Sequence, residues 1–257
     1  MRILTLLCVV GVGLSVAHPS FAAGDKLPNK KVQWPFDGMT GKVDKPSAQR
    51  GLQVYREVCA ACHGLERIAF RNLEALGFSE AETKALAAEY TVQDGPDDFG
   101  EMFDRPGIPS DRFVPPYPNK EAAQAAQNGA YPPDLSLMVK ARPDGANYLY
   151  SLLVGYKGKK GTPEGVEVPE GMYYNPYFPG KKIAMTPPLV DGLVTYEDGT
   201  EATADQMARD VVNFLQWAAE PEMEERKQMG IKVLIYLFIF TWFMYMIKKR
   251  IWARLKE

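Results

Sequence analysis

The chain has few of the side chains that bind transition metals or form cross-links, with three cysteines and two histidines among 257 residues. One of each, Cys8 and His18, lies near the N-terminus. The rest of the chain therefore holds only Cys59, Cys62 and His63. This set excludes a disulfide framework, because it allows one disulfide at most. It also excludes a zinc site built from about four Cys or His ligands, and any metal centre held by two histidines of the same mature chain.

The N-terminal segment is typical of a secretory signal peptide. Arg2 precedes an apolar run over residues 3–16, and a polar break over residues 18–20 leads to the small residue Ala22. The apolar run is shorter than the roughly 20 residues that a bilayer-spanning helix needs. We therefore predict that residues 1–22 are cleaved off and that the mature chain is exported.

The exported part also lacks an excess of positive charge. Residues 23–230 hold 23 Lys and Arg against 31 Asp and Glu, which makes this part clearly acidic. Nucleic-acid binding is therefore disfavoured, and a basic partner is favoured.

One long apolar run remains, over residues 230–247, with Lys232 as its single charge. It is long enough to cross a bilayer, and the lysine side chain can extend to the boundary. Five basic residues follow it: Lys248, Lys249, Arg250, Arg254 and Lys256. By the positive-inside tendency they remain in the cytoplasm. We predict a periplasmic domain over residues 23–229, a single inner-membrane helix over residues 230–249 and a cytoplasmic tail over residues 250–257.

The exported part shows helical periodicity separated by loops rich in Pro, Gly and Asp. Trp34 and Phe36 are expected to anchor an extended N-terminal arm. Ser47 is predicted to cap a helix that runs to about residue 63, and capping-box patterns begin at Ser79 and Thr203. Helices are thus expected over residues 47–63, 79–90, 119–128, 144–156 and 203–220. Loops are expected over residues 94–118 and 157–182, and the one clear strand pair over residues 189–190 and 193–196. The predicted fold is mainly α with long loops.

The segment Cys59-Ala-Ala-Cys62-His63 matches the attachment signature of c-type haem. On a helix, Cys62 and His63 lie three and four residues after Cys59, and hence on the same face. Two thiols placed there can form thioethers to the porphyrin while the imidazole reaches the iron. A zinc site lacks ligands, and a thioredoxin-type dithiol would require a βαβ context. We therefore predict one covalently bound haem c.

The second axial ligand cannot be a histidine of the mature chain, so methionine is the main candidate. Met185 lies between a basic loop and the pair Pro187-Pro188, which restricts the backbone of the segment. Met138 and Met172 are the rival candidates. An open sixth position would indicate peroxidase or gas-binding chemistry instead of electron transfer.

Taken together, the motifs resemble those of the cytochrome c1 family, the haem-bearing subunits of ubiquinol-cytochrome c oxidoreductase (cytochrome bc1), in its bacterial form. The resemblance covers nearly the whole mature chain and rests on residues 50–63, 132–136, 140–142, 148–156, 183–189 and 217–221, together with the C-terminal anchor. It implies a class I cytochrome c-like haem domain. It also implies that Met185 is the sixth ligand, and that Arg142 and Tyr148 approach a haem propionate, where a guanidinium can pair with the carboxylate.

The resemblance further implies a role in a respiratory or photosynthetic chain. The chain would take single electrons from the Rieske iron-sulfur protein and pass them to a soluble cytochrome c, with cytochrome b as its membrane partner in a dimeric complex. It would not be an enzyme on its own. A stand-alone membrane-anchored c-type carrier, and a haem enzyme with an open sixth site, are the alternative functions.

Two features of this sequence bear on that role. Five acidic residues could steer a basic carrier to the protein, namely Asp94, Asp97, Asp98, Glu101 and Asp104; a solvated loop is the alternative explanation. Some bacterial relatives carry an extra cysteine pair in the loop before the ligand methionine. This chain has none, so we expect packing and proline to keep that segment rigid.

Overall fold

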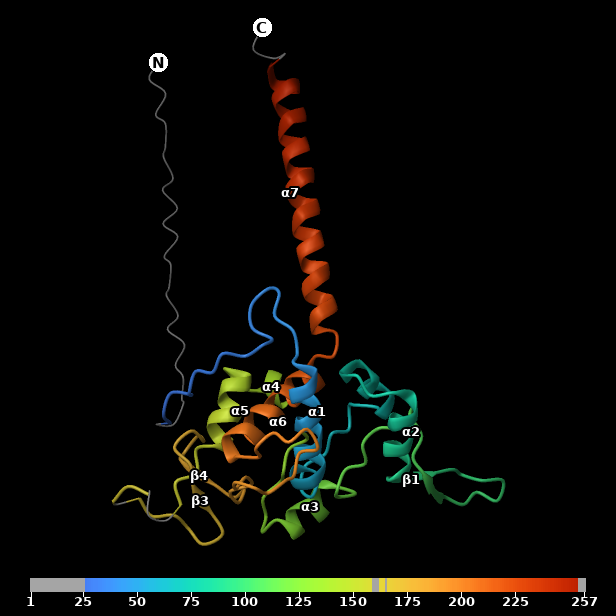
Figure 1. Ribbon diagram of the computed structural model, residues 1–257, viewed down its shortest axis with the longest axis vertical. Helices are drawn as coiled ribbons and strands as arrows, with labels where there is room; N and C mark the ends of the chain where they lie inside the picture. Colours follow the sequence, from blue (N-terminus) through green and yellow to red (C-terminus); the bar gives the residue numbers. More distant parts are fainter. Residues whose placement is uncertain (1–25, 159–161, 165, 254–257) are drawn as a thin grey trace, which may run out of the picture.

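The computed structural model describes residues 26–158, 162–164 and 166–253. The predicted signal peptide over residues 1–22 lies outside the described residues, as does the end of the predicted cytoplasmic tail. The described chain forms a mainly helical domain with long loops, from which one long helix rises (Figure 1). This is the fold class that the sequence predicts.

Two helices, α1 (Lys45–Val54) and α6 (Ala204–Ala219), pack against each other at the centre of the domain. Their backbones approach so closely that a Cβ atom at Gly51 would lie 2.1 Å from the Asp210 carbonyl oxygen. The fully buried Asp210 carboxylate accepts hydrogen bonds from Arg50 Nε (2.9 Å) and Ser47 Oγ (2.7 Å). Gly51 thus allows the close approach of α1 and α6, and the hydrogen bonds to Asp210 hold the two helices together. Loss of these partners would leave an unpaired buried charge, which is costly.

The α1 helix begins two residues earlier than predicted. It ends at Val54, well before the predicted end at about residue 63, and a π-helical turn follows it. Asp44 is its N-cap residue and Pro46 lies in its first turn, where the missing N–H costs nothing. Ser47 is therefore no cap, because its hydroxyl binds the Asp210 carboxylate instead. After Val54 the chain forms a π-helical turn, Tyr55–Cys59, in which the Ala60 N–H donates to the Tyr55 carbonyl at 2.8 Å.

The remaining helices of the domain are mostly short. They are η2, a 3-10 helix (Phe70–Leu76), α2 (Glu80–Ala88), α3 (Lys120–Ala126), α4 (Met138–Ala141) and α5 (Gly145–Leu153). The capping box at Ser79 and Glu82 is confirmed, because each residue binds the backbone N–H of the other. The Thr203 hydroxyl caps α6 by accepting from the Gln206 N–H at 3.1 Å. The predicted cap residues of these two helices are thus correct.

The strand prediction is wrong in place. The strands of the described chain are two antiparallel pairs, β1 (Thr91–Asp94) with β2 (Phe103–Pro106) and β3 (Tyr173–Tyr174) with β4 (Lys182–Ile183), at positions where the sequence predicts no strand. The turn at Gly192 does form, but its N–H donates to the Ala202 carbonyl at 2.8 Å. Residues 189–196 form no strand pair. Their apolar side chains Leu189, Val194 and Tyr196 are buried in the core instead.

The N-terminal arm is fastened as expected. Trp34 and Phe36 are 8% and 7% exposed, and their rings stack with centroids 5.4 Å apart. The indole N–H of Trp34 donates to the Asn147 side chain at 3.0 Å. The arm therefore closes the core over α5.

The last helix, α7 (Met223–Ala253), leaves the domain, and its apolar stretch packs against no other part of the described chain. It includes the predicted span, residues 230–249, and is long and apolar enough to cross a membrane, with a mean hydropathy of 1.9 over its most apolar window. Single apolar side chains such as Phe238 (76% exposed) face outward along it. A lipid environment is the surrounding in which such a surface is stable.

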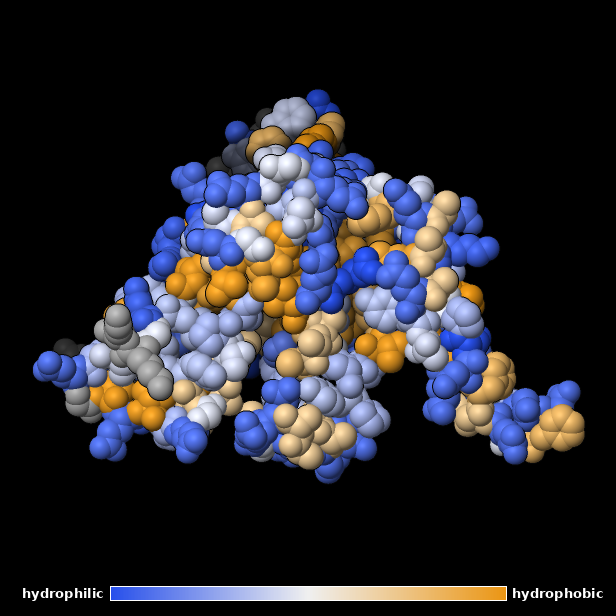
Figure 2. Space-filling model, turned by 60° about the horizontal axis from the view of Figure 1, so that its bottom comes forward, coloured by the Kyte–Doolittle hydropathy of each residue, from blue (hydrophilic) through white to orange (hydrophobic). Residues whose placement is uncertain are grey.

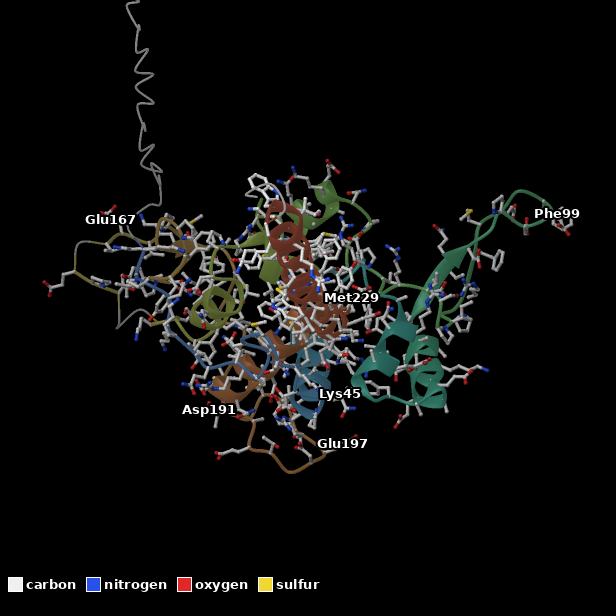
Figure 3. All side chains as sticks on the ribbon, turned by 90° about the horizontal axis from the view of Figure 1, so that it is seen from above. Lys45, Phe99, Glu167, Asp191, Glu197 and Met229 are labelled. Carbon is white, nitrogen blue, oxygen red and sulfur yellow. The ribbon has the colours of Figure 1, made fainter. Side chains whose placement is uncertain are left out.

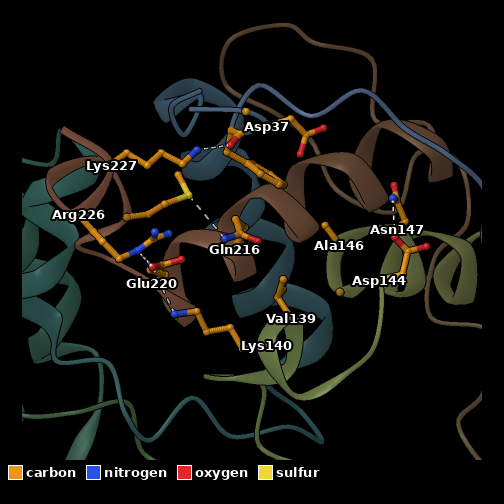
Figure 4. A pocket seen from close by; sticks show the side chains of 14 residues that line it. Asp37, Val139, Lys140, Asp144, Ala146, Asn147, Gln216, Glu220, Arg226 and Lys227 are labelled. Atoms are coloured by element: carbon orange, nitrogen blue, oxygen red, sulfur yellow. Dashed lines mark hydrogen bonds and ion pairs between the residues drawn. The ribbon is translucent and has the colours of Figure 1, made fainter. Parts of the chain in front are cut away.

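The base of α7 is fastened to the domain beside a cleft (Figure 4). The Glu220 carboxylate accepts a hydrogen bond from Arg226 and lies 3.4 Å from Lys140 Nζ. Lys227 Nζ donates to the carbonyl oxygens of Phe36 (2.6 Å) and Gly41 (3.1 Å). Lys140 and Arg226 are exposed, but Glu220 between them is only 13% exposed, so one largely buried carboxylate joins α4 and the start of α7.

Candidate haem-binding site

The cysteine-histidine motif lies where α1 ends, at the end of the domain that points away from α7 (Figure 1). The Cys62 and His63 N–H groups both donate to the Cys59 carbonyl, at 3.1 and 2.9 Å. These two hydrogen bonds place the three residues of the motif on a single turn of backbone, which is the helical spacing on which the predicted haem attachment depends. Both thiols are half-buried and not joined in a disulfide. On the same underside of the domain, apolar side chains gather in the middle of the face (Figure 2).

The His63 ring is oriented by a backbone carbonyl. Its Nδ1 atom lies 2.8 Å from the Pro133 carbonyl oxygen. Because a carbonyl can only accept, Nδ1 carries the proton and Nε2 is left with a free lone pair. Burial lowers the pKa of His63, which favours the neutral imidazole. This is the protonation state and the tautomer that a metal ligand requires.

The backbone around His63 is held by neighbouring segments. The fully buried Tyr55 donates its hydroxyl to the His63 carbonyl oxygen at 3.1 Å. The Leu135 N–H donates to the Gly64 carbonyl at 2.9 Å, and Gln127 Nε2 lies 3.4 Å from Cys62 Sγ. Residues 133–135 thus run along the motif and fix its position.

The Cys59 thiol is poorly suited to chemistry that needs a thiolate. Burial raises the pKa of the Cys59 thiol to about 12. A redox-active or zinc-binding cysteine has a lowered pKa instead. Among the residues that the structure describes, no group of three or more His, Cys, Asp or Glu side chains could hold a metal ion. The donor set, two thiols and one oriented imidazole on a single turn, fits a covalently attached haem.

The three candidate methionines lie in different environments. Met138 is 7% exposed in α4 and belongs to the core, and Met172 is 41% exposed in a loop. Met185 lies two residues after the end of β4 and, like Cys59, is partly buried and packed against the core. Its backbone carbonyl accepts a hydrogen bond from the Tyr156 hydroxyl at 3.0 Å. Burial raises the pKa of Tyr156, so this hydroxyl remains a donor.

Arg142 and Tyr148, the predicted propionate pair, are brought together. Tyr148 is 4% exposed in α5, whereas Arg142 is exposed at the end of α4. Burial raises the pKa of the Tyr148 hydroxyl, and the Arg142 guanidinium beside it opposes that rise. Lys26 Nζ lies 5.0 Å from the centre of the Tyr148 ring. The pair therefore forms a positively charged edge next to a buried hydroxyl, which fits a carboxylate.

Sequence reasoning missed the groups that hold the ligand segments. These groups are the hydroxyls of Tyr55 and Tyr156, which bind backbone carbonyls, and the backbone carbonyl of Pro133, which binds the His63 ring. Hydrogen bonds to or from the backbone leave no spacing pattern in the sequence. The segments that carry the family resemblance include all three residues, within 50–63, 132–136 and 148–156, but the resemblance assigns none of them a role.

Comparison with known proteins places the chain in a family. The model of the Cytochrome C1 family matches residues 34–255. Cytochrome c1 of Rhodospirillum rubrum is 49% identical over 98% of this chain and 97% of its own length. The cytochrome b-c1 complex catalytic subunit of Candida albicans mitochondria is 52% identical over 92% of this chain and 81% of its own.

A third relative is much longer than this chain. Cytochrome b/c1 of Bradyrhizobium diazoefficiens is 49% identical over 89% of this chain, which spans only 36% of that protein. The matches extend from the arm through the haem motif and into α7. The chain belongs to the cytochrome c1 family.

Proposed function

We propose that this chain binds one haem c through Cys59 and Cys62, with His63 and Met185 as axial ligands, and transfers single electrons within a cytochrome bc1 complex. The observation that carries the proposal is the oriented imidazole. Its Nδ1 is engaged by the Pro133 carbonyl, which leaves Nε2 for the iron, beside two thiols on the same turn. The bound haem supplies a one-electron couple.

The roles of the chain's own residues follow from their positions. Cys59 and Cys62 would fasten the group near the end of α1, and His63 and Met185 would be its iron ligands. A thioether ligand at Met185 would raise the reduction potential and keep substrates away from the metal. Arg142 and Tyr148 offer a cation and a buried hydroxyl to a propionate. With both axial positions filled, the site favours an electron carrier over a haem enzyme.

The partners are inferred from the anchor and the family. The relative named cytochrome b/c1 and the relative named as a b-c1 complex subunit support a cytochrome b partner for α7. Basic residues after the span favour a cytoplasmic C-terminus and a periplasmic haem domain in the inner membrane. The Rieske iron-sulfur protein would donate the electron, and a soluble cytochrome c would accept it, in a dimeric complex.

The acidic segment forms a projecting hairpin. β1 and β2 extend sideways from the domain, and Phe99 at the tip is 91% exposed (Figure 3). Asp94 forms an ion pair with Arg105, so its charge is largely balanced. The exposed side chains of Asp97, Asp98, Glu101 and Asp104 present negative charge away from the core, which supports steering of a basic carrier.

A redox titration of the purified membrane complex, with optical spectra, tests the proposal. We expect b-type and c-type haem to co-purify in a fixed ratio, and the c-type haem to titrate as one high-potential, one-electron centre. A c-type haem that purifies alone would indicate a stand-alone anchored carrier. Carbon monoxide binding readily to the reduced, intact protein would indicate a haem enzyme with an open site.

A further inference from the structure

The segment that carries Met185 has almost no regular structure. Its two flanks are buried, with Ile183 at 9% and Leu189 at 8% exposure, but Thr186 and Pro187 between them are exposed. β4 ends at Ile183, two residues before the methionine. No cysteine occurs between residues 157 and 190, so no disulfide can restrain this loop. Some other contact must keep the thioether in place.

The end of α5 supplies two such contacts. The fully buried Asn175 donates through Nδ2 to the Leu152 carbonyl at 2.8 Å, and its own N–H donates to the Lys181 carbonyl at 2.9 Å. This side chain joins the β3–β4 hairpin to α5. The second contact is the hydrogen bond from the Tyr156 hydroxyl to the Met185 carbonyl oxygen, 3.0 Å long.

The position of Tyr156 is itself tightly defined. A Cβ atom at the preceding Gly155 would lie 2.5 Å from both the Ser151 carbonyl oxygen and Cδ2 of Tyr177. The chain therefore leaves α5 through a close contact that only glycine permits without a shift. Tyr156 extends from this fixed point to the one backbone oxygen that belongs to the candidate ligand.

We propose that Tyr156 is a positioning residue, whose hydroxyl holds the Met185 thioether at the iron by tying the ligand segment to the end of α5. This hydrogen bond would restrain the ligand segment as a disulfide within the loop could. The inference rests on the proposed ligation by Met185, and it adds a residue that acts through the ligand and not on the metal.

Displacement of the methionine by imidazole tests the inference on the intact, purified membrane complex. The variant Tyr156→Phe removes one oxygen atom and keeps the ring. We expect it to raise the apparent affinity of the ferric c-type haem for imidazole about tenfold, the ratio that corresponds to the loss of one buried hydrogen bond. The near-infrared band of methionine-ligated ferric haem should weaken in parallel.

Tyr173→Phe is the matched control, because it removes the same atom from a tyrosine of the neighbouring strand β3 that is 37% exposed. It should leave the imidazole affinity at the wild-type value. The inference is overturned if Tyr156→Phe also keeps the wild-type affinity while Met185→Leu changes it, and the proposed ligation then stands. If Met185→Leu leaves both the affinity and the near-infrared band unchanged, the ligation itself fails, and the inference fails with it.

Discussion

The histidine side and the methionine side of the candidate site are built by opposite means. His63 follows a helix that is packed in the core, beside two attachment points and the fully buried Tyr55. Met185 lies in a loop with exposed neighbours and is held at its backbone by Tyr156. In both cases a tyrosine hydroxyl binds the carbonyl of the ligand residue. The difference is that the histidine side has several further restraints, so the methionine side should be the one that opens first.

Removing both attachment points should have the largest effect. In the variant Cys59→Ala with Cys62→Ala, we expect complete loss of covalently bound haem, because the remaining cysteine, Cys8, lies in the predicted signal peptide. Mass spectrometry of the processed polypeptide measures this directly. The single variant Cys62→Ala is the control and should retain one thioether. A polypeptide that still carries the added porphyrin mass after both changes would contradict the assignment.

Removing only the methionine ligand should leave attachment intact. Met185→Leu keeps a similar volume but has no thioether, so we expect the wild-type amount of covalent haem, a lower reduction potential and new carbon monoxide binding in the reduced state. Redox titration and a carbon monoxide difference spectrum measure these. Met172→Leu, at 41% exposure, is the control. An unchanged potential in Met185→Leu would mean that another group is the sixth ligand.

The smallest effect is expected on the histidine side. Tyr55→Phe removes the donor to the His63 carbonyl and should lower the free energy of unfolding by about 1–2 kcal/mol. This corresponds to a decrease in melting temperature of roughly 2–8 °C. Unlike Tyr156→Phe, it should not change imidazole binding, because the thioethers and Pro133 still hold the ring. Tighter imidazole binding in Tyr55→Phe would remove the contrast between the two sides.

The parts of the fold that the sequence predicts well are those with a local signal. The cap residues Ser79 and Thr203 and the apolar length of α7 are read from a few neighbouring residues, and the structure confirms them. The strands were missed because two-residue and four-residue pairs in Gly- and Pro-rich segments have too little apolar alternation to detect. Residues 189–196 were misassigned because their apolar side chains serve the core, and not a ladder.

In the candidate site, too, only the residues with a local sequence signal are predicted from the sequence alone. Cys59, Cys62 and His63 follow from one motif, and the structure places them on one turn. Spacing alone left Met185 beside two rivals, and it remains a proposal, as do the roles of Arg142 and Tyr148. The tyrosine contacts join residues 8 and 29 positions apart through backbone atoms. No residue pattern encodes such contacts, so only the three-dimensional structure reveals them.

The contacts at the base of α7 bear on how electrons would reach the domain. Lys227 holds the N-terminal arm, and Glu220 pairs with both Arg226 and Lys140, so these contacts restrain the domain relative to α7. Under the proposed function, the electron donor and the electron acceptor would therefore each have to approach a domain that is tethered at a set height above the membrane.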